Sequence, residues 1–337
     1  MKLFFDNNLC EEVVEAELNE RVRSGRPGLS AAFRKEADSI YSEYPPHKRS
    51  APFHVLYQRF FGSLGYRNRI ETLLREMESA AGPLSIPCWF SKTLTAEEEG
   101  AQLNEDRTRL AFRVRPESLR NAGRLAYLLR HERLHVHDLL DPAFGHDAAR
   151  PLSGASLAAE DLLRDRYRTL WDLSVDGRLE RLGWLPKGVR ERRAAEFRAL
   201  FRRLGEERAG RVFEALWSGP RPSDADLRRM IQSAEELCDT VGVSGSGEGG
   251  DERGDPAPGG PCPLCRFPTY EWAALTEPLA RRVRAEFPEW RPWQGLCSQC
   301  ANRYLLATLQ VPAAGPLPGQ EDPWIPGLSS IHSEGGW

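Results

Sequence analysis

The stretch RPESLRNAGRLAYLLRHERLHVHDLLDP, residues 115–142, decides how the rest of the chain is interpreted. Its apolar residues recur at the three- and four-residue spacing of an amphipathic helix. Pro116 stands near the first turn, where a missing N–H costs nothing, and the residue before Pro142 avoids helical geometry. The pattern therefore predicts one long helix that ends at Asp141.

This helix contains the pattern HExxH, formed by His131, Glu132 and His135. Residues four apart on a helix differ by only about 40° in direction and lie one turn apart. Both imidazoles can therefore reach one metal ion at about 2.0–2.1 Å. Glu132 stands beside them, placed to take a proton from a water on that metal. The spacing predicts a catalytic zinc site with Glu132 as general base.

The surroundings of the motif add to this interpretation. LSIPCWFS (84–91) and TRLAFRVR (108–115) are expected to form short strands on either side of a polar, acidic segment, residues 95–106. A helix with HExxH after short strands resembles the zincin metallopeptidases, over about residues 84–185. The resemblance implies that the two histidines bind zinc, that the glutamate is the general base, and that a third ligand follows later in the chain.

Two places can supply the third ligand. In metzincin-like members it follows on the same run after a glycine, but here Asp138 replaces that glycine and Asp141 stands at the ligand position. In gluzincin-like members an acidic residue comes from a later helix. The stretch WDLSVDGRLE (171–180) places Asp172, Asp176 and Glu180 on one helical face.

Asp176 is the preferred third ligand, followed by Asp172 and then Asp141. A neighbouring carboxylate would accept the imidazole N–H of His131 or His135. If the helix face were only solvated, its acids would pair with arginines, but two aspartates among apolar residues need partners of their own.

Other polar residues near the motif have weaker signals. His137 points to the wrong side of the helix for the same metal, whereas Asp138 lies within about 20° of the His131 direction. His146 follows in a loop, where it is either a surface residue or a group that stabilises an oxyanion. Tyr167 is a similar candidate.

Four of the seven cysteines form two CxxC pairs, Cys262/Cys265 and Cys297/Cys300. Two such pairs present four thiolates for a closed tetrahedral zinc site. The arrangement, over about residues 261–311, resembles a treble-clef finger or zinc ribbon, with helices expected over 276–287 and 301–310. The other three cysteines are expected to be small buried apolar residues: Cys10, Cys88 and Cys238.

Composition indicates a soluble globular protein, and the expected helices and short strands indicate the α+β class, mostly helical. The 337 residues include 40% hydrophobic and 28% charged residues, with a net charge of −3. No apolar run reaches the roughly 18 residues of a membrane helix, and the N-terminus lacks a secretory signal, so a cytoplasmic protein without membrane contact is expected.

We expect five segments along the chain. They are a helical N-terminal region (1–82), a zincin-like metallopeptidase domain with a small sheet and an active-site helix (83–241), a flexible Gly/Pro-rich linker (242–260), a zinc finger (261–311) and a disordered tail (312–337).

The leading functional hypothesis is a metallopeptidase with one catalytic and one structural Zn²⁺, acting on a peptide or protein. The finger would bind a protein or nucleic-acid partner. The alternative is an inactive binding module in which the finger carries the interaction. A third hypothesis is a hydrolase of a non-peptide amide.

Overall fold

The computed structural model describes residues 2–147, 150–152, 157–201, 204–243, 259–288 and 290–306, with only the backbone described over 157–162. The chain divides into two compact units, Met1–Gly250 and Asp251–Trp337. The expected linker, 242–260, falls almost wholly outside the described residues, and the expected tail, 312–337, falls wholly outside them.

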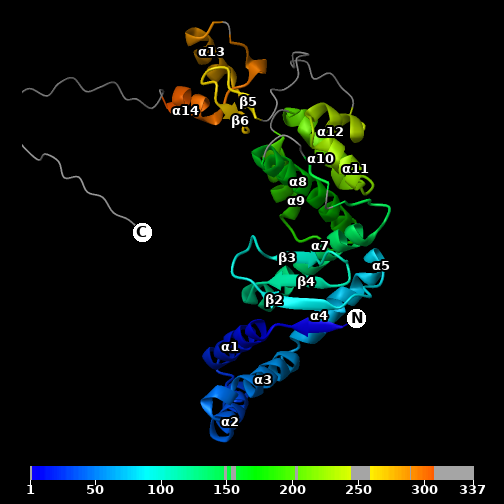
Figure 1. Ribbon diagram of the computed structural model, residues 1–337, viewed down its shortest axis with the longest axis vertical. Coiled ribbons are helices and arrows are strands. Elements are labelled where there is room, and N and C mark those ends of the chain that lie inside the picture. The colour runs from blue at the N-terminus through cyan, green and yellow to red at the C-terminus, as the bar shows by residue number, and fades with distance from the viewer. Residues whose placement is uncertain are drawn as a thin grey trace, which may run out of the picture. The chain divides into compact units, whose positions relative to one another are not determined.

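A small sheet forms the centre of the first unit (Figure 1). Its strand order is β1-β2-β4-β3, with β1, β2 and β4 parallel and β3 antiparallel to β4. The strands are β1 (Leu3–Phe5), β2 (Cys88–Lys92), β3 (Gly100–Leu103) and β4 (Leu110–Val114). Because side chains alternate between faces, Phe5, Phe90 and Phe112 form one buried row, with successive ring centroids 5.2 and 4.9 Å apart.

The N-terminal helices share their core with this sheet. Buried residues of the helices and of the strands form one hydrophobic cluster, and β1 comes from the start of the chain. The boundary expected between residues 82 and 83 therefore runs through a common core. The helices are α1 (Asn7–Arg23), α2 (Gly28–Glu43), a 3₁₀ turn (Pro46–Lys48), α3 (Ser50–Ser63), α4 (Tyr66–Glu76) and α5 (Glu78–Ala81).

The single long helix expected over residues 115–142 is in fact two helices. The chain forms α6 (Pro116–Arg120) and α7 (Ala122–Leu140). Asn121 lies between them in an extended conformation, and its side chain accepts a hydrogen bond from the N–H of Arg124. An asparagine that caps a new helix start competes with helix continuation, which apolar periodicity alone does not reveal.

The remaining helices of the first unit pack around a second core. A smaller cluster, which includes Leu134 of α7 and Val175 and Leu179 of the next helix, joins α7 to this layer. The helices are α8 (Leu157–Arg181), α9 (Val189–Leu200), α10 (Glu206–Ser218), α11 (Asp224–Met230) and α12 (Ala234–Thr240).

The second unit is small and has its own core. It holds a short hairpin, two helices and a 3₁₀ turn. These elements are β5 (Gly260–Pro261), β6 (Pro268–Thr269), α13 (Glu277–Glu286), the turn Pro292–Gln294 and α14 (Ser298–Leu306). Helix α14 begins directly after Cys297, three residues before the expected start at residue 301.

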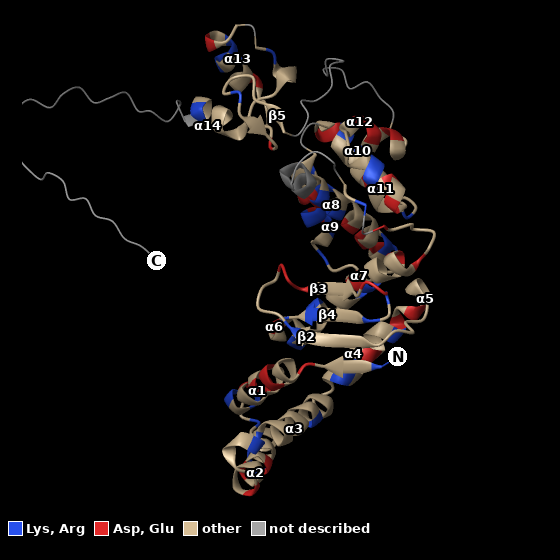
Figure 2. Cartoon of the chain, in the orientation of Figure 1, with Lys and Arg blue, Asp and Glu red and all other residues tan. Residues whose placement is uncertain are grey.

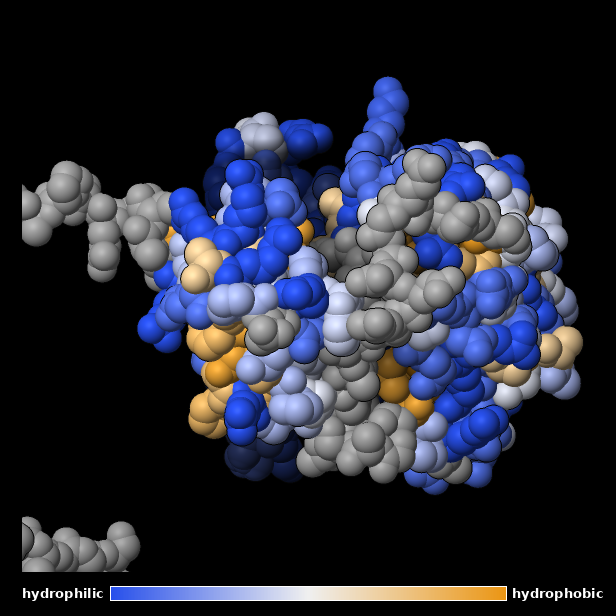
Figure 3. Space-filling view, turned by 90° about the horizontal axis from the view of Figure 1, so that it is seen from above, coloured by the Kyte–Doolittle hydropathy of each residue, from blue (hydrophilic) through white to orange (hydrophobic). Residues whose placement is uncertain are grey.

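The prediction of a mostly helical α+β protein is confirmed. In the part of the chain that the structure describes, no helix has both the length and the apolar composition of a membrane span. The face seen in Figure 3 is predominantly hydrophilic, with its hydrophobic residues in small groups. The expectation of a zincin-like domain concerns the arrangement of the motif residues, which is described next.

Close packing between α8 and α10 gives a testable consequence. A Cβ on Gly177 would stand 2.0 Å from the carbonyl oxygen of Trp217. Gly177→Ala should therefore lower the free energy of unfolding by about 1–3 kcal/mol, despite alanine's better helix propensity. Gly210→Ala in α10, where the added Cβ meets no atom within 4 Å, should be neutral or stabilise by up to about 1 kcal/mol. Urea denaturation measures the free energy of unfolding of both variants. Equal stability of the two variants would contradict the close packing of α8 against α10.

Candidate functional site

Helix α7 holds the motif between two layers of the first unit. Apolar residues on one side of α7 are buried in the core shared with the sheet, and Leu134 packs against α8. Tyr127, His131 and His135 follow one another at four-residue spacing, so they form one row along the helix. This row faces α8, because Asp172 and Asp176 of α8 contact its side chains.

Three side-chain atoms converge at the centre of the site. His131 Nε2 lies 3.1 Å from His135 Nε2, and Asp172 Oδ1 lies 3.0 Å from His135 Nε2 and 3.4 Å from His131 Nε2. Ligands about 2.0–2.2 Å from a tetrahedral metal would lie about 3.3–3.6 Å apart. These three residues therefore form a group that could hold a metal ion and leave a fourth position open.

Asp176 occupies a different place. Its Oδ1 lies 2.8 Å from His131 Nδ1, the ring nitrogen that faces away from the three-atom group. The carboxylate also accepts hydrogen bonds from the hydroxyl of Tyr127 at 3.1 Å and from Nε of Arg193 at 2.7 Å, and it is fully buried. A carboxylate in this position orients the imidazole and makes Nε2 a better ligand.

Charge is balanced within the site. Arg193, from α9, bonds to both Asp172 and Asp176, at 3.0 and 2.7 Å. Burial lowers the pKa of His131, but the two aspartates outweigh this effect and raise it to about 10. Burial raises the pKa of Asp172, yet its hydrogen bonds to His131 and His135 hold it well below its usual value. Both aspartates are therefore carboxylates at neutral pH.

The geometry reverses the expected order of the third-ligand candidates. The sequence favours Asp176, but its Oδ1 contacts His131 Nδ1, whereas Asp172 lies with the Nε2 atoms of the two histidines. Both lie on one face of α8, and sequence spacing does not reveal which turn of α8 stands opposite the histidines. Asp141 instead pairs with Arg221, and Glu180 pairs with Arg190.

Glu132 faces the sheet side of the site. Its Oε2 accepts a hydrogen bond of 2.9 Å from the backbone N–H of Ala101 in β3. Because β3 is an edge strand of the sheet, this N–H points away from β4. One carboxylate oxygen is thus anchored by the strand, and the structure records no hydrogen bond to the other among the described residues.

A cleft of about 1080 Å³ opens over these groups. His131, Glu132, His135 and Asp172 all line it, together with residues 96–101 and parts of α8 and α9. The acidic segment 95–106 therefore borders the cleft. This arrangement lets a ligand of peptide size reach the convergent atoms and Glu132 at the same time.

A second buried carboxylate supports His135 indirectly. Asp138 is fully buried and accepts hydrogen bonds from Trp171 Nε1 at 2.8 Å and from Arg178 and Arg221. The ring of Trp171 stands edge-on to that of His135, with centroids 4.3 Å apart. Asp138 therefore lies near the site, as expected, but acts through Trp171.

His146 and Tyr167, the weaker candidates near the motif, share a different carboxylate. His146 Nδ1 and the Tyr167 hydroxyl both contact Asp224, at 3.2 and 2.6 Å. Tyr167 also lines the cleft. Burial and this hydrogen bond raise its pKa well above the usual value, so Tyr167 stays protonated. His137 does not belong to the group of His131, His135 and Asp172.

Sequence reasoning missed Tyr127 and Arg193. Tyr127 precedes His131 by one turn, and this spacing could have placed it on the same face. Arg193 lies among other arginines on α9 and has no comparable signal. Only the packing of α9 against α8 brings it to the two aspartates.

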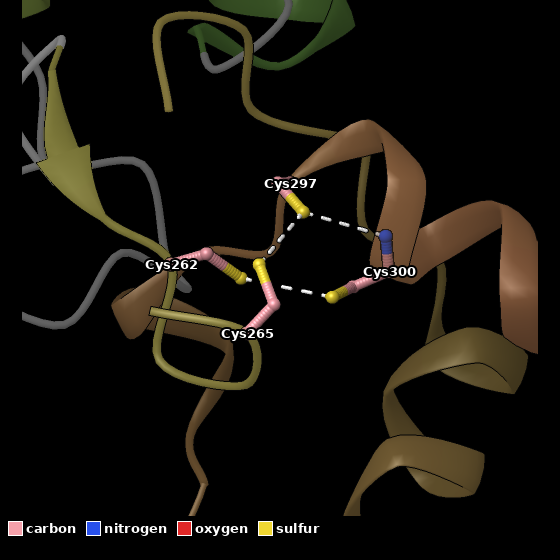
Figure 4. Close-up of side chains that lie close together, drawn as sticks. All are labelled: Cys262, Cys265, Cys297 and Cys300. Atoms are coloured by element: carbon pink, nitrogen blue, oxygen red, sulfur yellow. Dashed lines mark hydrogen bonds between the residues drawn. The ribbon is translucent and has the colours of Figure 1, made fainter. Parts of the chain in front are cut away.

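The second unit holds another candidate metal site, shown in Figure 4. Cys262 Sγ lies 4.0 Å from Cys300 Sγ, and Cys265 Sγ lies 3.7 Å from Cys297 Sγ. Sulfurs about 2.3 Å from a tetrahedral zinc lie about 3.8 Å apart. The four predicted cysteines thus form a cluster that could bind a metal ion.

Backbone N–H groups favour a thiolate at Cys262, whereas burial and the neighbouring thiols raise the pKa values of Cys297 and Cys300. Burial raises the pKa of Cys262, but N–H groups of Cys265, Cys297 and Leu264 outweigh it and lower the pKa to about 7. The N–H of Cys300 also points to Cys297 Sγ at 3.4 Å, at the start of α14. The three scattered cysteines are buried, as predicted: Cys10, Cys88 and Cys238.

No protein-family model, curated protein or solved structure matches the chain.

The placement of the two aspartates predicts different effects on metal affinity. Asp172→Asn replaces a converging carboxylate with a neutral amide and should weaken Zn²⁺ binding at this site by more than about 100-fold. Asp176→Asn leaves all three converging atoms and should weaken it by about 10–100-fold. Chelator competition measures the Zn²⁺ affinity of both variants. Asp141→Asn is the control and should keep the wild-type affinity. A larger loss from Asp176→Asn would reverse the assignment.

Proposed function

We propose that the chain is a zinc-dependent metallopeptidase, gluzincin-like in drawing its third ligand from a later helix. The observation that carries the proposal is the convergence of His131 Nε2, His135 Nε2 and Asp172 Oδ1 in a cleft that Glu132 also lines. Two imidazoles and one carboxylate form a donor set that zinc takes in catalytic sites, where a fourth position stays open.

Each residue has a role in hydrolysis. When bound, Zn²⁺ would polarise the scissile carbonyl and make water more acidic. Glu132, with one oxygen held by Ala101, takes the proton of the attacking water and passes it to the leaving amine. Asp176 and Arg193 hold the ligands in place, which limits the reorganisation that the reaction requires.

The edge strand supports a peptide as substrate. Ala101 and Gly100 of β3 line the cleft, and the N–H of Ala101 points toward α7 rather than toward β4. An extended peptide can add to such an edge through those outward-facing backbone groups of β3 that do not already bond to Glu132. This placement would bring a scissile bond between β3 and the converging ligands, within reach of Glu132.

The cysteine cluster supports a second, structural zinc. A unit of this size has little core, so a bound metal would supply much of its folding free energy. We further propose that this finger binds a protein or nucleic-acid partner. In the alternative function, an inactive binding module, the HExxH site is vestigial or only structural, and a metal-free His131/His135 group would favour it.

Metal stoichiometry tests the two sites together. Elemental analysis should find two zinc ions per wild-type chain, one in the His131→Ala/His135→Ala variant and one in the Cys262→Ser/Cys300→Ser variant. Each pair of changes removes two ligands from one site and leaves the other complete. One zinc in both wild type and the histidine variant would eliminate the catalytic site and favour the binding module.

The role of Glu132 gives the direct test of activity. Glu132→Gln should keep both zinc ions and lower the rate of peptide cleavage by about 10²–10⁴-fold, because the amide cannot accept the proton. Glu235→Gln, an exposed change in α12, should leave the rate unchanged. Fluorogenic peptide libraries measure the rate, and full activity of Glu132→Gln would refute the mechanism.

A further inference from the structure

Charged side chains line both walls of the cleft, with arginines the more numerous on the α8 and α9 side and glutamates the more numerous on the sheet side. On the helix side stand Arg164 and Arg168 of α8 and Arg192 of α9, all lining the cleft. On the sheet side stand Glu97 and Glu98, just before β3. Figure 2 shows this contrast, with blue segments on α8 and α9 and a red segment that leads into β3.

Arg168 has the most direct relation to the site. It precedes Asp172 by four residues on α8, so the two side chains lie one turn apart on the same face. Arg168 is exposed. Within the parts of the chain that the structure describes, it forms no hydrogen bond or ion pair. Its guanidinium therefore has all five N–H donors available to a ligand in the cleft.

The neighbouring cations differ from Arg168. Arg193 is half-buried and already bonds to Asp172 and Asp176. Arg192 Nε lies 3.5 Å from Glu196 Oε1, and Arg192 Nη2 donates a hydrogen bond of 3.3 Å to the Tyr127 hydroxyl. Arg164 stands one turn before Arg168 and already has an interaction of its own within the structure.

We infer that the cleft selects peptides with an acidic side chain one or two residues from the scissile bond, bound by Arg168. The inference rests on the proposed peptidase function and specifies its substrate. One helical turn separates Arg168 from Asp172 by about 5–6 Å, and an extended peptide advances about 3.3 Å per residue. A guanidinium also matches a carboxylate in bidentate geometry, which gives directional selectivity.

Binding, separated from cleavage, provides the test. The zinc-loaded Glu132→Gln protein is titrated with three fluorescein-labelled octapeptides that differ only in Glu, Gln or Lys on both sides of a central apolar pair. Fluorescence anisotropy should give about threefold to tenfold tighter binding of the Glu peptide than of the Gln peptide. Adding Arg168→Glu should reverse the order of the Glu and Lys peptides, and Arg168→Gln should abolish the preference for Glu over Gln.

Arg34→Glu, an exposed change within α2, is the matched control and should keep the wild-type preference. Circular dichroism establishes that each variant is folded. Equal binding of the three peptides, no binding of any of them, or a preference that survives both Arg168 variants would overturn the inference. Tighter, Arg168-dependent binding of a single-stranded oligonucleotide than of the Glu peptide would overturn it in favour of nucleic acid.

Cleavage of the same peptides by the chain with Glu132 intact distinguishes this result from failure of the proposed function. Arg168-dependent binding of the Glu peptide without cleavage would refute the peptidase and keep the acidic-peptide site. Cleavage without charge preference would keep the peptidase and refute the role of Arg168.

Discussion

The site depends on two carboxylates buried on one face of α8. A buried carboxylate without partners is strongly destabilising, and Asp176 is fully buried while Asp172 is nearly so. Their partners come from two other helices, His131 and His135 from α7 and Arg193 from α9. Burial of either aspartate therefore requires that α7 and α9 both pack against α8. The same packing aligns the candidate ligands.

The neighbouring position on α7 meets a different layer. Glu132 is rotated by about 100° from His131, and this rotation directs it to the edge strand rather than to α8. Ala101 of β3 then fixes one of its oxygens. The register of β3 on β4 thus sets the place of Glu132, while α8 sets the place of the candidate ligands. The cleft lies where these two layers meet on α7.

Charge compensation extends beyond the converging atoms. Asp138 is balanced by Arg178 and Arg221 and positions Trp171 against His135. The abundant arginines therefore have three roles in the first unit. Some neutralise buried aspartates, some pair on the surface, and Arg168 remains available in the cleft. In the second unit, the four cysteines of the cluster come from the loop between β5 and β6 and from the start of α14.

Local patterns in the sequence determined the residue types of both candidate sites. The two histidines of HExxH are four residues apart on a helix, and the cysteines within each CxxC pair are three residues apart. Local backbone geometry therefore brings the two side chains of each pair close together. The mostly helical α+β class followed from the same periodicities. The break at Asn121 and the strands β1 and β3 did not, because capping and sheet pairing compete with local propensity.

Only the tertiary structure decided between Asp172 and Asp176 and brought in Tyr127 and Arg193. The two aspartates are equivalent on a helical wheel, and the choice between them depends on how far α8 is shifted along α7. That shift is set by side-chain packing between the helices, which no short-range pattern encodes.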